Sequence, residues 1–229
     1  MSAGAPYRAS VWLLDADAPA DVPGDEALAP YAAWLDASER ARLLRFQRPS
    51  RRRQFLVGRV LARLALGHVL GAEPSLIRLQ DRPGAAPLLV SPSAPTAGFS
   101  ISHSGRWVAC AVSGSSKVGL DIERIDASRD IDALAAQAFD EDQRTWLAAR
   151  PAATRVRDFY SLWSRAEAQF KLDMPAGSSF DLSTPELAIV LCCGQALDRV
   201  PEVEHRTLSA PLPPACAPAP TRSRPKTSS

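Results

Sequence analysis

A helical pattern of twenty residues, followed at once by short strand-forming segments, is the feature that most constrains the fold. In residues 51–70 the apolar side chains recur at helical spacing, and Gly71 ends the pattern. The residues that carry this period are Phe55, Leu56, Val60, Leu61, Leu64 and Val69. Residues 75–80 and 82–90 then predict two short strands, and residues 99–112 predict a hairpin. Long helices and short strands in one chain predict a mixed α and β protein.

Helix and strand signals continue on both sides of this region. Residues 10–14 predict a strand, and Asp36 with Glu39 three positions later is the pattern of a capping box, for a helix that runs to about Arg48. Further along, residues 117–125 predict a strand, and helical patterns return at 131–149 and 154–172. From Ser209 the chain has six prolines, three basic residues and no acidic residue, and we expect a disordered tail.

Length and composition narrow the class of protein. The 229 residues, 46% of them hydrophobic, are enough for one large domain or two small halves. The sequence has no run of the roughly 18 to 20 apolar residues that a membrane span needs and no signal peptide, so we expect a cytoplasmic protein without a membrane partner. The four cysteines lack CxxC spacing and predict free thiols rather than a zinc site or a disulfide framework.

The basic residues are unevenly distributed, although the net charge is only +2. Nine arginines lie between Arg40 and Arg63, which predicts a local positive field for an anionic ligand; a solvated helix face or a polyanion patch are the alternatives. With 7% aromatic residues, a nucleic-acid surface is not favoured. The chain has 24 arginines and only three lysines, which are Lys117, Lys171 and Lys226. Because lysine is rare in this chain, Lys171 is a candidate functional residue.

Two acidic residues share one face of the strand predicted at 117–125. Alternation places Asp121 and Glu123 on the same side, so that their carboxylates project next to each other. Two such charges favour a cation, and oxygen ligands without histidine or cysteine favour magnesium over zinc. The alternative is an edge strand whose solvent-facing side carries acidic residues.

The helix predicted at 154–172 carries a second group of candidate residues. Trp163, Glu167 and Lys171 are spaced i, i+4 and i+8, and Phe159 lies one turn earlier on the same face. Glu167 and Lys171 alone could be an ordinary surface ion pair. Together with Asp121 and Glu123, they predict a magnesium site next to a lysine that faces phosphate.

The hairpin segment FSISHSGRWVACAV contains His103, one of only three histidines, and taken alone this residue could be a structural, hydrogen-bonded side chain. In order and separation, that segment, VGLDIERI and FYSLWSRAEAQFK resemble the 4'-phosphopantetheinyl transferases, in the pseudo-dimeric type that primes secondary-metabolite synthases. The segments SERARLLRF and FLVGRVLARLAL resemble the N-terminal helices of that family, so the resemblance extends over about residues 11–171.

The resemblance implies a reaction and a role for each candidate residue. Such an enzyme transfers the 4'-phosphopantetheine arm of coenzyme A to a serine of an acyl- or peptidyl-carrier protein and releases adenosine 3',5'-bisphosphate. By the family pattern Asp121, Glu123 and Glu167 would hold Mg²⁺, and Glu167, or a metal-bound water near it, would also be the candidate base. The candidate ligands of coenzyme A, by the same pattern, are Arg42 for the 3'-phosphate, Ser102 and His103 for the pyrophosphate, and Lys171 for phosphate charge.

The chain departs from the family pattern at two cations. Ala86 stands where the family has the lysine of a Gly-Lys-Pro sequence, and Arg82 could take over its role. Ala166 stands where the family has the lysine that precedes the catalytic glutamate, and the closing apolar strand of the family is not recognisable after residue 205. A degenerate paralogue that binds coenzyme A or a carrier protein without turnover is therefore the alternative.

The family fold implied for this chain is α+β, with two similar halves, each a small, mostly antiparallel sheet packed on a long helix. We expect residues 1–116 to bind the nucleotide of coenzyme A and residues 117–208 to carry the magnesium and catalytic site, with the tail at 209–229. Fused halves make a monomer sufficient. The segment from Arg124 to Trp146 is the expected contact with a carrier protein.

Overall fold

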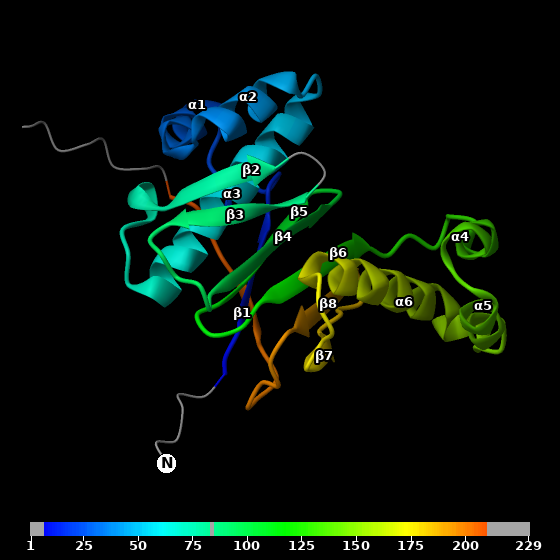
Figure 1. Cartoon of the computed structure of the whole chain (residues 1–229). Coiled ribbons are helices and arrows are strands. Elements are labelled where there is room, and N and C mark those ends of the chain that lie inside the picture. The colour runs from blue at the N-terminus through cyan, green and yellow to red at the C-terminus, as the bar shows by residue number, and fades with distance from the viewer. Residues whose placement is uncertain (1–6, 83–84, 210–229) are drawn as a thin grey trace, which may run out of the picture.

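A computed structural model describes residues 7–82 and 85–209 (Figure 1). The N-terminal half begins with a strand, continues through helices and ends in two hairpins. Its elements are β1 (Ser10–Asp15), α1 (Asp25–Leu28), the 3-10 helix η1 (Ala29–Trp34), α2 (Ala37–Arg45), α3 (Pro49–Leu70), the 3-10 helix η2 (Pro74–Leu76), β2 (Arg78–Arg82), β3 (Ala85–Ser91), β4 (Gly98–Ser104) and β5 (Trp107–Ser113).

The C-terminal half again joins a strand to helices and then to further strands. Its elements are β6 (Val118–Arg124), α4 (Ile131–Ala138), α5 (Glu141–Ala148), α6 (Ala152–Leu172), β7 (Ser178–Asp181), β8 (Leu187–Cys193) and β9 (Val203–His205). The helical pattern at 131–149 is two helices because Asp140 caps α5, with a capping box completed by Gln143.

The helix boundaries of the N-terminal half follow from local chemistry. The capping box of Asp36 and Glu39 is present at the start of α2. The end predicted near Arg48 is wrong, since α2 stops at Arg45: Pro49 occupies the first turn of α3 and holds Arg48 in an extended conformation. At its other end α3 stops where predicted, because Gly71 adopts the left-handed conformation with φ of 63°.

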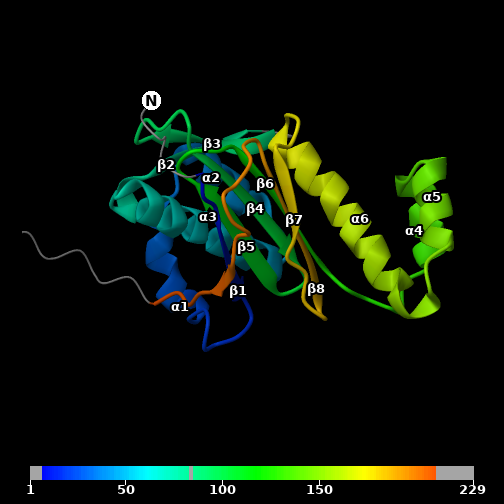
Figure 2. The same cartoon turned by 90° about the horizontal axis from the view of Figure 1, so that it is seen from below.

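The two sheets lie face to face between the two long helices (Figure 2). The first sheet has the order β4-β5-β1-β9, the second has the order β6-β8-β7, and β2 and β3 form a separate hairpin. All pairings are antiparallel except that of β1 with β9. The fold is therefore α+β, with a small, mostly antiparallel sheet and a long helix in each half, as predicted.

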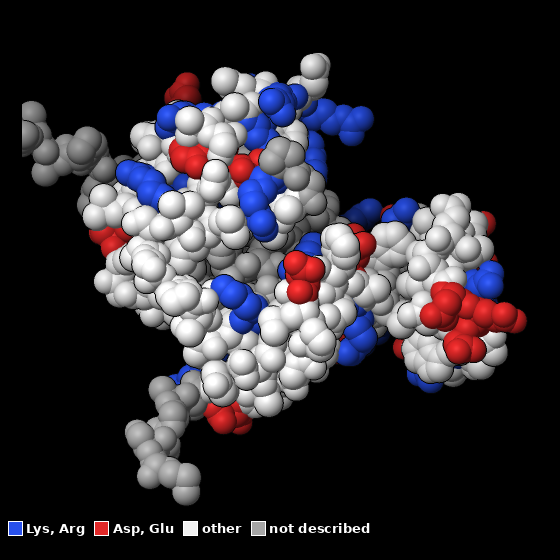
Figure 3. Space-filling view, viewed as in Figure 1, with Lys and Arg blue, Asp and Glu red and all other residues white. Residues whose placement is uncertain are grey.

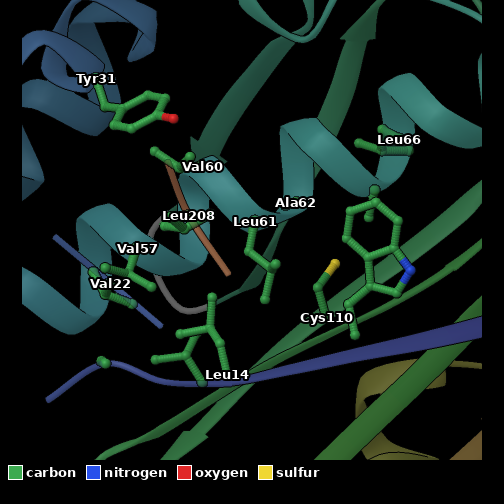
Figure 4. Close-up of a cluster of buried hydrophobic side chains, with 14 of the residues drawn as sticks. Leu14, Val22, Tyr31, Val57, Val60, Leu61, Ala62, Leu66, Cys110 and Leu208 are labelled. Carbon is green, nitrogen blue, oxygen red and sulfur yellow. The ribbon is translucent and has the colours of Figure 1, made fainter. Parts of the chain in front are cut away.

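Strand alternation builds a core on each side of the first sheet. One face packs on α3 through residues such as Leu14 and Cys110, which contact the core that includes Leu61 (Figure 4). The opposite face, which includes Val11 and Leu13, packs on the second sheet through the apolar side chains of β6 and β8. The apolar face of β6 is thus buried between the sheets, so its carboxylate face is turned toward α6.

The chain returns to the N-terminal half after β8. Strand β9 pairs with β1, Leu208 is buried in the core around α3, and the hydroxyl of Tyr31 donates to the carbonyl of Ser209 over 2.7 Å. Residues 210–229, which hold nearly all of the predicted tail, lie outside the described residues. In the part that is described, no helix has both the length and the hydropathy to cross a bilayer.

Candidate active site between the two halves

Three serine hydroxyls of β4 connect the two halves of the protein. Ser100, Ser102 and Ser104 alternate along the strand and therefore point the same way, toward the edge of β6. Their oxygens accept hydrogen bonds from the backbone N–H groups of Leu120, Ile122 and Arg124, over 2.9, 3.2 and 2.9 Å. These N–H groups lie on the edge of β6 opposite β8, so the hydroxyls satisfy them and fix β6 beside β4.

The central serine belongs to a polar cluster with residues from three elements. Ser102 donates to Asp121 Oδ1 over 3.0 Å, and Lys171 Nζ lies 2.7 Å from the same oxygen. Lys171 also donates to Ser102 Oγ over 3.2 Å and to the carbonyl of Leu120 over 3.1 Å. Lysine has three donors, and all three are in use. To contact a phosphate, as predicted, Lys171 must therefore give up one of these bonds.

A glycine in β6 allows α6 to pack close enough for Lys171 to reach this cluster. Gly119 lies on the carboxylate face of β6, directly under the helix. A Cβ at this position would stand 2.0 Å from the carbonyl oxygen of Ala168 and 2.5 Å from the backbone nitrogen of Leu172. Only glycine permits this close approach of helix and strand.

Glu123 lies on the same face of β6, two residues beyond Asp121. Its Oε2 accepts a hydrogen bond of 2.6 Å from Ser104. Burial raises the pKa of Glu123, and the negative charge of Asp121 adds to this effect, while the bond from Ser104 opposes it. The two carboxylates thus repel each other in a poorly solvated place, which a bound cation would relieve.

The described residues contain no group of three or more His, Cys, Asp or Glu side chains arranged to hold a metal ion. Even so, the carboxylates on β6 suit a divalent cation. Asp121 is buried with 4% exposure, and its Oδ2 has no hydrogen-bond partner in the described structure. Such an oxygen is costly to bury, and a hard cation is a fitting partner for it. Glu167 is half-buried on α6, one turn before Lys171.

His103 points to the opposite face of β4 from the serines, where it meets α3. Its Nδ1 lies 3.2 Å from Nη1 of Arg51. Partial desolvation lowers the pKa of the ring, and the positive charges of Arg51 and Lys171 lower it further. His103 is therefore a neutral ring at pH 7, and the positive charges of one cation from each half act on it.

The two remaining predicted ligands lie in the N-terminal half. Arg42 on α2 is paired with Asp81 over 2.8 Å, and Arg82 on β2 donates to the carbonyl of Ala86 over 2.8 Å. Neither arginine takes part in the cluster of Ser102, Asp121 and Lys171. Basic side chains nevertheless gather over this half of the molecule, whereas acidic ones gather on the lobe formed by α4 and α5 (Figure 3).

Sequence reasoning missed several residues of the site. Ser102 was predicted, but Ser100 and Ser104 were not, and the alternation of serines in the segment FSISHS was the available signal for the hydroxyls that join β4 to β6. The role of Arg51 had no such signal, since it is one of nine arginines in its region and is singled out only by its contact with His103.

Comparison with known proteins identifies the family of this chain. Residues 22–115 match the family described as 4'-phosphopantetheinyl transferase, N-terminal, and residues 117–193 match the 4'-phosphopantetheinyl transferase superfamily. The two matches meet at the junction between β5 and β6.

Individual relatives carry the same name. The chain is 30% identical over 162 residues to 4'-phosphopantetheinyl transferase HetI of Nostoc sp.. The aligned residues make up 70% of this chain and 66% of the relative. It is 29% identical to a putative 4'-phosphopantetheinyl transferase of Synechocystis sp., over 70% of this chain and 63% of that protein. It is 33% identical to 4'-phosphopantetheinyl transferase psf-1 of Bacillus pumilus, over 78% of this chain and 72% of that protein. The chain thus spans just under two thirds of the first two relatives, and it belongs to the 4'-phosphopantetheinyl transferase superfamily.

Proposed function

We propose that this protein transfers the 4'-phosphopantetheine arm of coenzyme A to a serine of an acyl- or peptidyl-carrier protein, in a magnesium-dependent reaction. The serine oxygen attacks the phosphorus that bears the pantetheine arm, the bond from that phosphorus to the bridging oxygen of the pyrophosphate breaks, and adenosine 3',5'-bisphosphate leaves. The observation that supports this function most strongly is the cluster of Ser102, Asp121 and Lys171, which combines residues of both halves.

The carboxylates on β6 are the proposed magnesium ligands, together with Glu167. The unpartnered Oδ2 of Asp121 and the raised pKa of Glu123 both indicate a place that favours a cation. Bound there, Mg²⁺ would offset the charge that develops on the pyrophosphate during transfer.

The remaining candidate residues have distinct proposed roles. Glu167, one turn before Lys171 on α6, accepts the proton of the attacking serine hydroxyl. Lys171 places a positive charge beside Asp121 and stabilises negative charge on the phosphate. Ser102 and His103 support the pyrophosphate from β4, and Arg42 supports the nucleotide from α2.

Each half of the protein has its own proposed role. Residues 1–116 bind the nucleotide, and residues 117–208 provide the carboxylates and Glu167. A carrier protein would meet the segment from Arg124 to Trp146, where the side chain of Trp146 is 46% exposed. The protein would act as a monomer in the cytoplasm, with secondary-metabolite carrier proteins as its substrates.

Two alanines favour a second candidate function, in which the protein binds coenzyme A without turnover. Ala86 lies in β3 and Ala166 is exposed on α6, and neither can supply the cation that the family has at these positions. The three carboxylates and Lys171 are all retained, and this favours the catalytic alternative.

Intact-mass spectrometry of an apo carrier protein tests the proposal. After incubation with this protein, coenzyme A and magnesium, the carrier gains the mass of one phosphopantetheine. The gain requires magnesium and is absent with Glu167→Ala, whereas Glu186→Ala, a change in the loop before β8, leaves it intact. If several carriers gain no mass while the protein binds coenzyme A, the binding function is correct and the transferase is refuted.

A further inference from the structure

Arg51 differs from the other arginines of α3 because two uncharged side chains hold its guanidinium. Its guanidinium donates to Gln54 Oε1 over 2.8 Å and lies 3.2 Å from Nδ1 of His103. Both partners are uncharged. Throughout residues 7–82 and 85–209, no carboxylate lies within ion-pair distance of Arg51, so its positive charge is not neutralised.

Three other arginines of the same helix are used for structure. They pair with acidic side chains: Arg53 with Asp25, Arg59 with Asp81 and Glu39, and Arg63 with Glu39. Arg52 is exposed, and within residues 7–82 and 85–209 no side chain holds it in place. An arginine that is fixed in position while its charge is left free is suited to an anionic ligand.

The unpaired guanidinium is held in position by buried groups. Gln54, with 9% exposure, accepts from Arg51 through its oxygen and donates through its nitrogen to the carbonyl of Gly105. Gly105 forms the turn between β4 and β5, with φ of 55°. Helix, glutamine and turn therefore orient Arg51 before any ligand arrives, which lowers the entropic cost of binding.

We propose that Arg51 binds a phosphate group of coenzyme A, as a cation of the N-terminal half that acts together with His103. This inference rests on the proposed function, because it assumes that coenzyme A occupies the site between the halves. It adds to that function a binding residue that neither the sequence pattern nor the family comparison identifies.

The arrangement of charges supports this assignment. The positive charges of Arg51 on α3 and Lys171 on α6 both lower the pKa of His103, and Arg51 is the one in direct contact with the ring. Because Nδ1 of the neutral ring faces the guanidinium, it accepts, and Nε2 carries the proton and remains a donor. A phosphate beside His103 would then meet a donor of the ring and the free donors of Arg51.

A purely structural role is the competing explanation. Arg51 could simply tie α3 to the β4–β5 hairpin through Gln54 and His103. In that case replacement of Arg51 would lower the melting temperature and leave the affinity for coenzyme A unchanged.

Calorimetric titration of coenzyme A into the full chain separates the two roles. Arg51→Ala is compared with Arg52→Ala, which removes an equal, exposed charge from the next position of α3. We expect a roughly 10- to 100-fold loss of affinity for Arg51→Ala and less than a 2-fold loss for Arg52→Ala. Arg51→Lys keeps the charge and should recover part of the loss, while thermal unfolding confirms that each variant is folded.

Titration with 3'-dephospho-coenzyme A identifies the phosphate. An equal loss with both ligands assigns Arg51 to the pyrophosphate, and a loss with coenzyme A alone assigns it to the 3'-phosphate. Equal affinities of Arg51→Ala and Arg52→Ala, in a wild-type protein that binds coenzyme A, refute this inference and leave the proposed function standing. A wild-type protein that does not bind coenzyme A refutes both.

Discussion

Replacement of Gly119 by alanine tests whether the close contact of β6 with α6 positions the catalytic side chains. The new Cβ would stand 2.0 Å from the carbonyl oxygen of Ala168, whereas real Cβ atoms essentially never come within 3.0 Å of another heavy atom. Because both nearest atoms belong to the helix backbone, no side chain can rotate away to relieve the overlap. The helix must therefore move from the strand by about 1 Å, the difference between the two distances.

Two effects of different size follow from this displacement. Overpacking of this kind costs about 1 to 3 kcal/mol of unfolding free energy. Moving Glu167 and Lys171 by about 1 Å relative to Asp121 should reduce the rate of transfer by about 100-fold, since catalysis is more sensitive to position than stability is. The loss of activity should therefore greatly exceed what the unfolded fraction explains.

The assays are urea unfolding and a timed measurement of phosphopantetheine transfer. Gly24→Ala is the matched control, because a Cβ at Gly24 has no neighbour within 4 Å and the backbone has an ordinary φ of −57°. We expect this control to be close to wild type in both assays. If Gly119→Ala were as stable and as active as Gly24→Ala, the contact between β6 and α6 would not position the site.

Other properties of the fold can be tested in the same way. Glu39→Gln should lower the free energy of unfolding by about 3 to 5 kcal/mol in a urea titration, because it leaves the fully buried Arg63 without a counter-charge, and a loss below 1 kcal/mol would contradict the ion pair. Arg51→Ala should raise the pKa of His103 in an NMR titration, since a repelling charge is removed, and an unchanged pKa would contradict their proximity. Because the folded pKa of His103 is lowered, the unfolded chain binds its proton first, so this residue reduces stability as the pH falls below about 6.5, and Arg51→Ala should lessen that loss. Burial raises the pKa of Cys193 to about 12, so iodoacetamide at pH 8 should label this thiol only after unfolding, and rapid labelling of the native protein would contradict its burial.

Local signals in the sequence were enough to predict most of the N-terminal half. The capping box at Asp36, the left-handed Gly71 and the alternating hairpin each act through residues a few positions apart, so they can be recognised without a structure. Strand β8 was missed for the opposite reason. All seven of its residues are buried, so it shows no alternation of apolar and polar side chains, and only the surrounding sheet and helix define it as a strand.

The candidate site was predictable in its residue types but not in its contacts. Alternation in β6 and helical spacing in α6 correctly placed Asp121 and Lys171 on facing surfaces. Whether Lys171 bonds to Asp121 depends on how closely α6 meets β6 at Gly119. That close approach is a contact of Gly119 with Ala168 and Leu172, which lie 49 and 53 positions further along the chain. Such long-range geometry is not encoded in any local pattern.

The most direct test of the account measures coenzyme A binding by calorimetry, with and without magnesium, to the wild-type protein and to Asp121→Asn. Asp126→Asn, a change of a half-buried carboxylate in the loop after β6, is the matched control. We predict that magnesium strengthens binding to the wild type and to Asp126→Asn, and that it has no such effect on Asp121→Asn, because the buried Oδ2 is no longer a carboxylate oxygen. Equal strengthening of all three proteins by magnesium would contradict a cation site at Asp121.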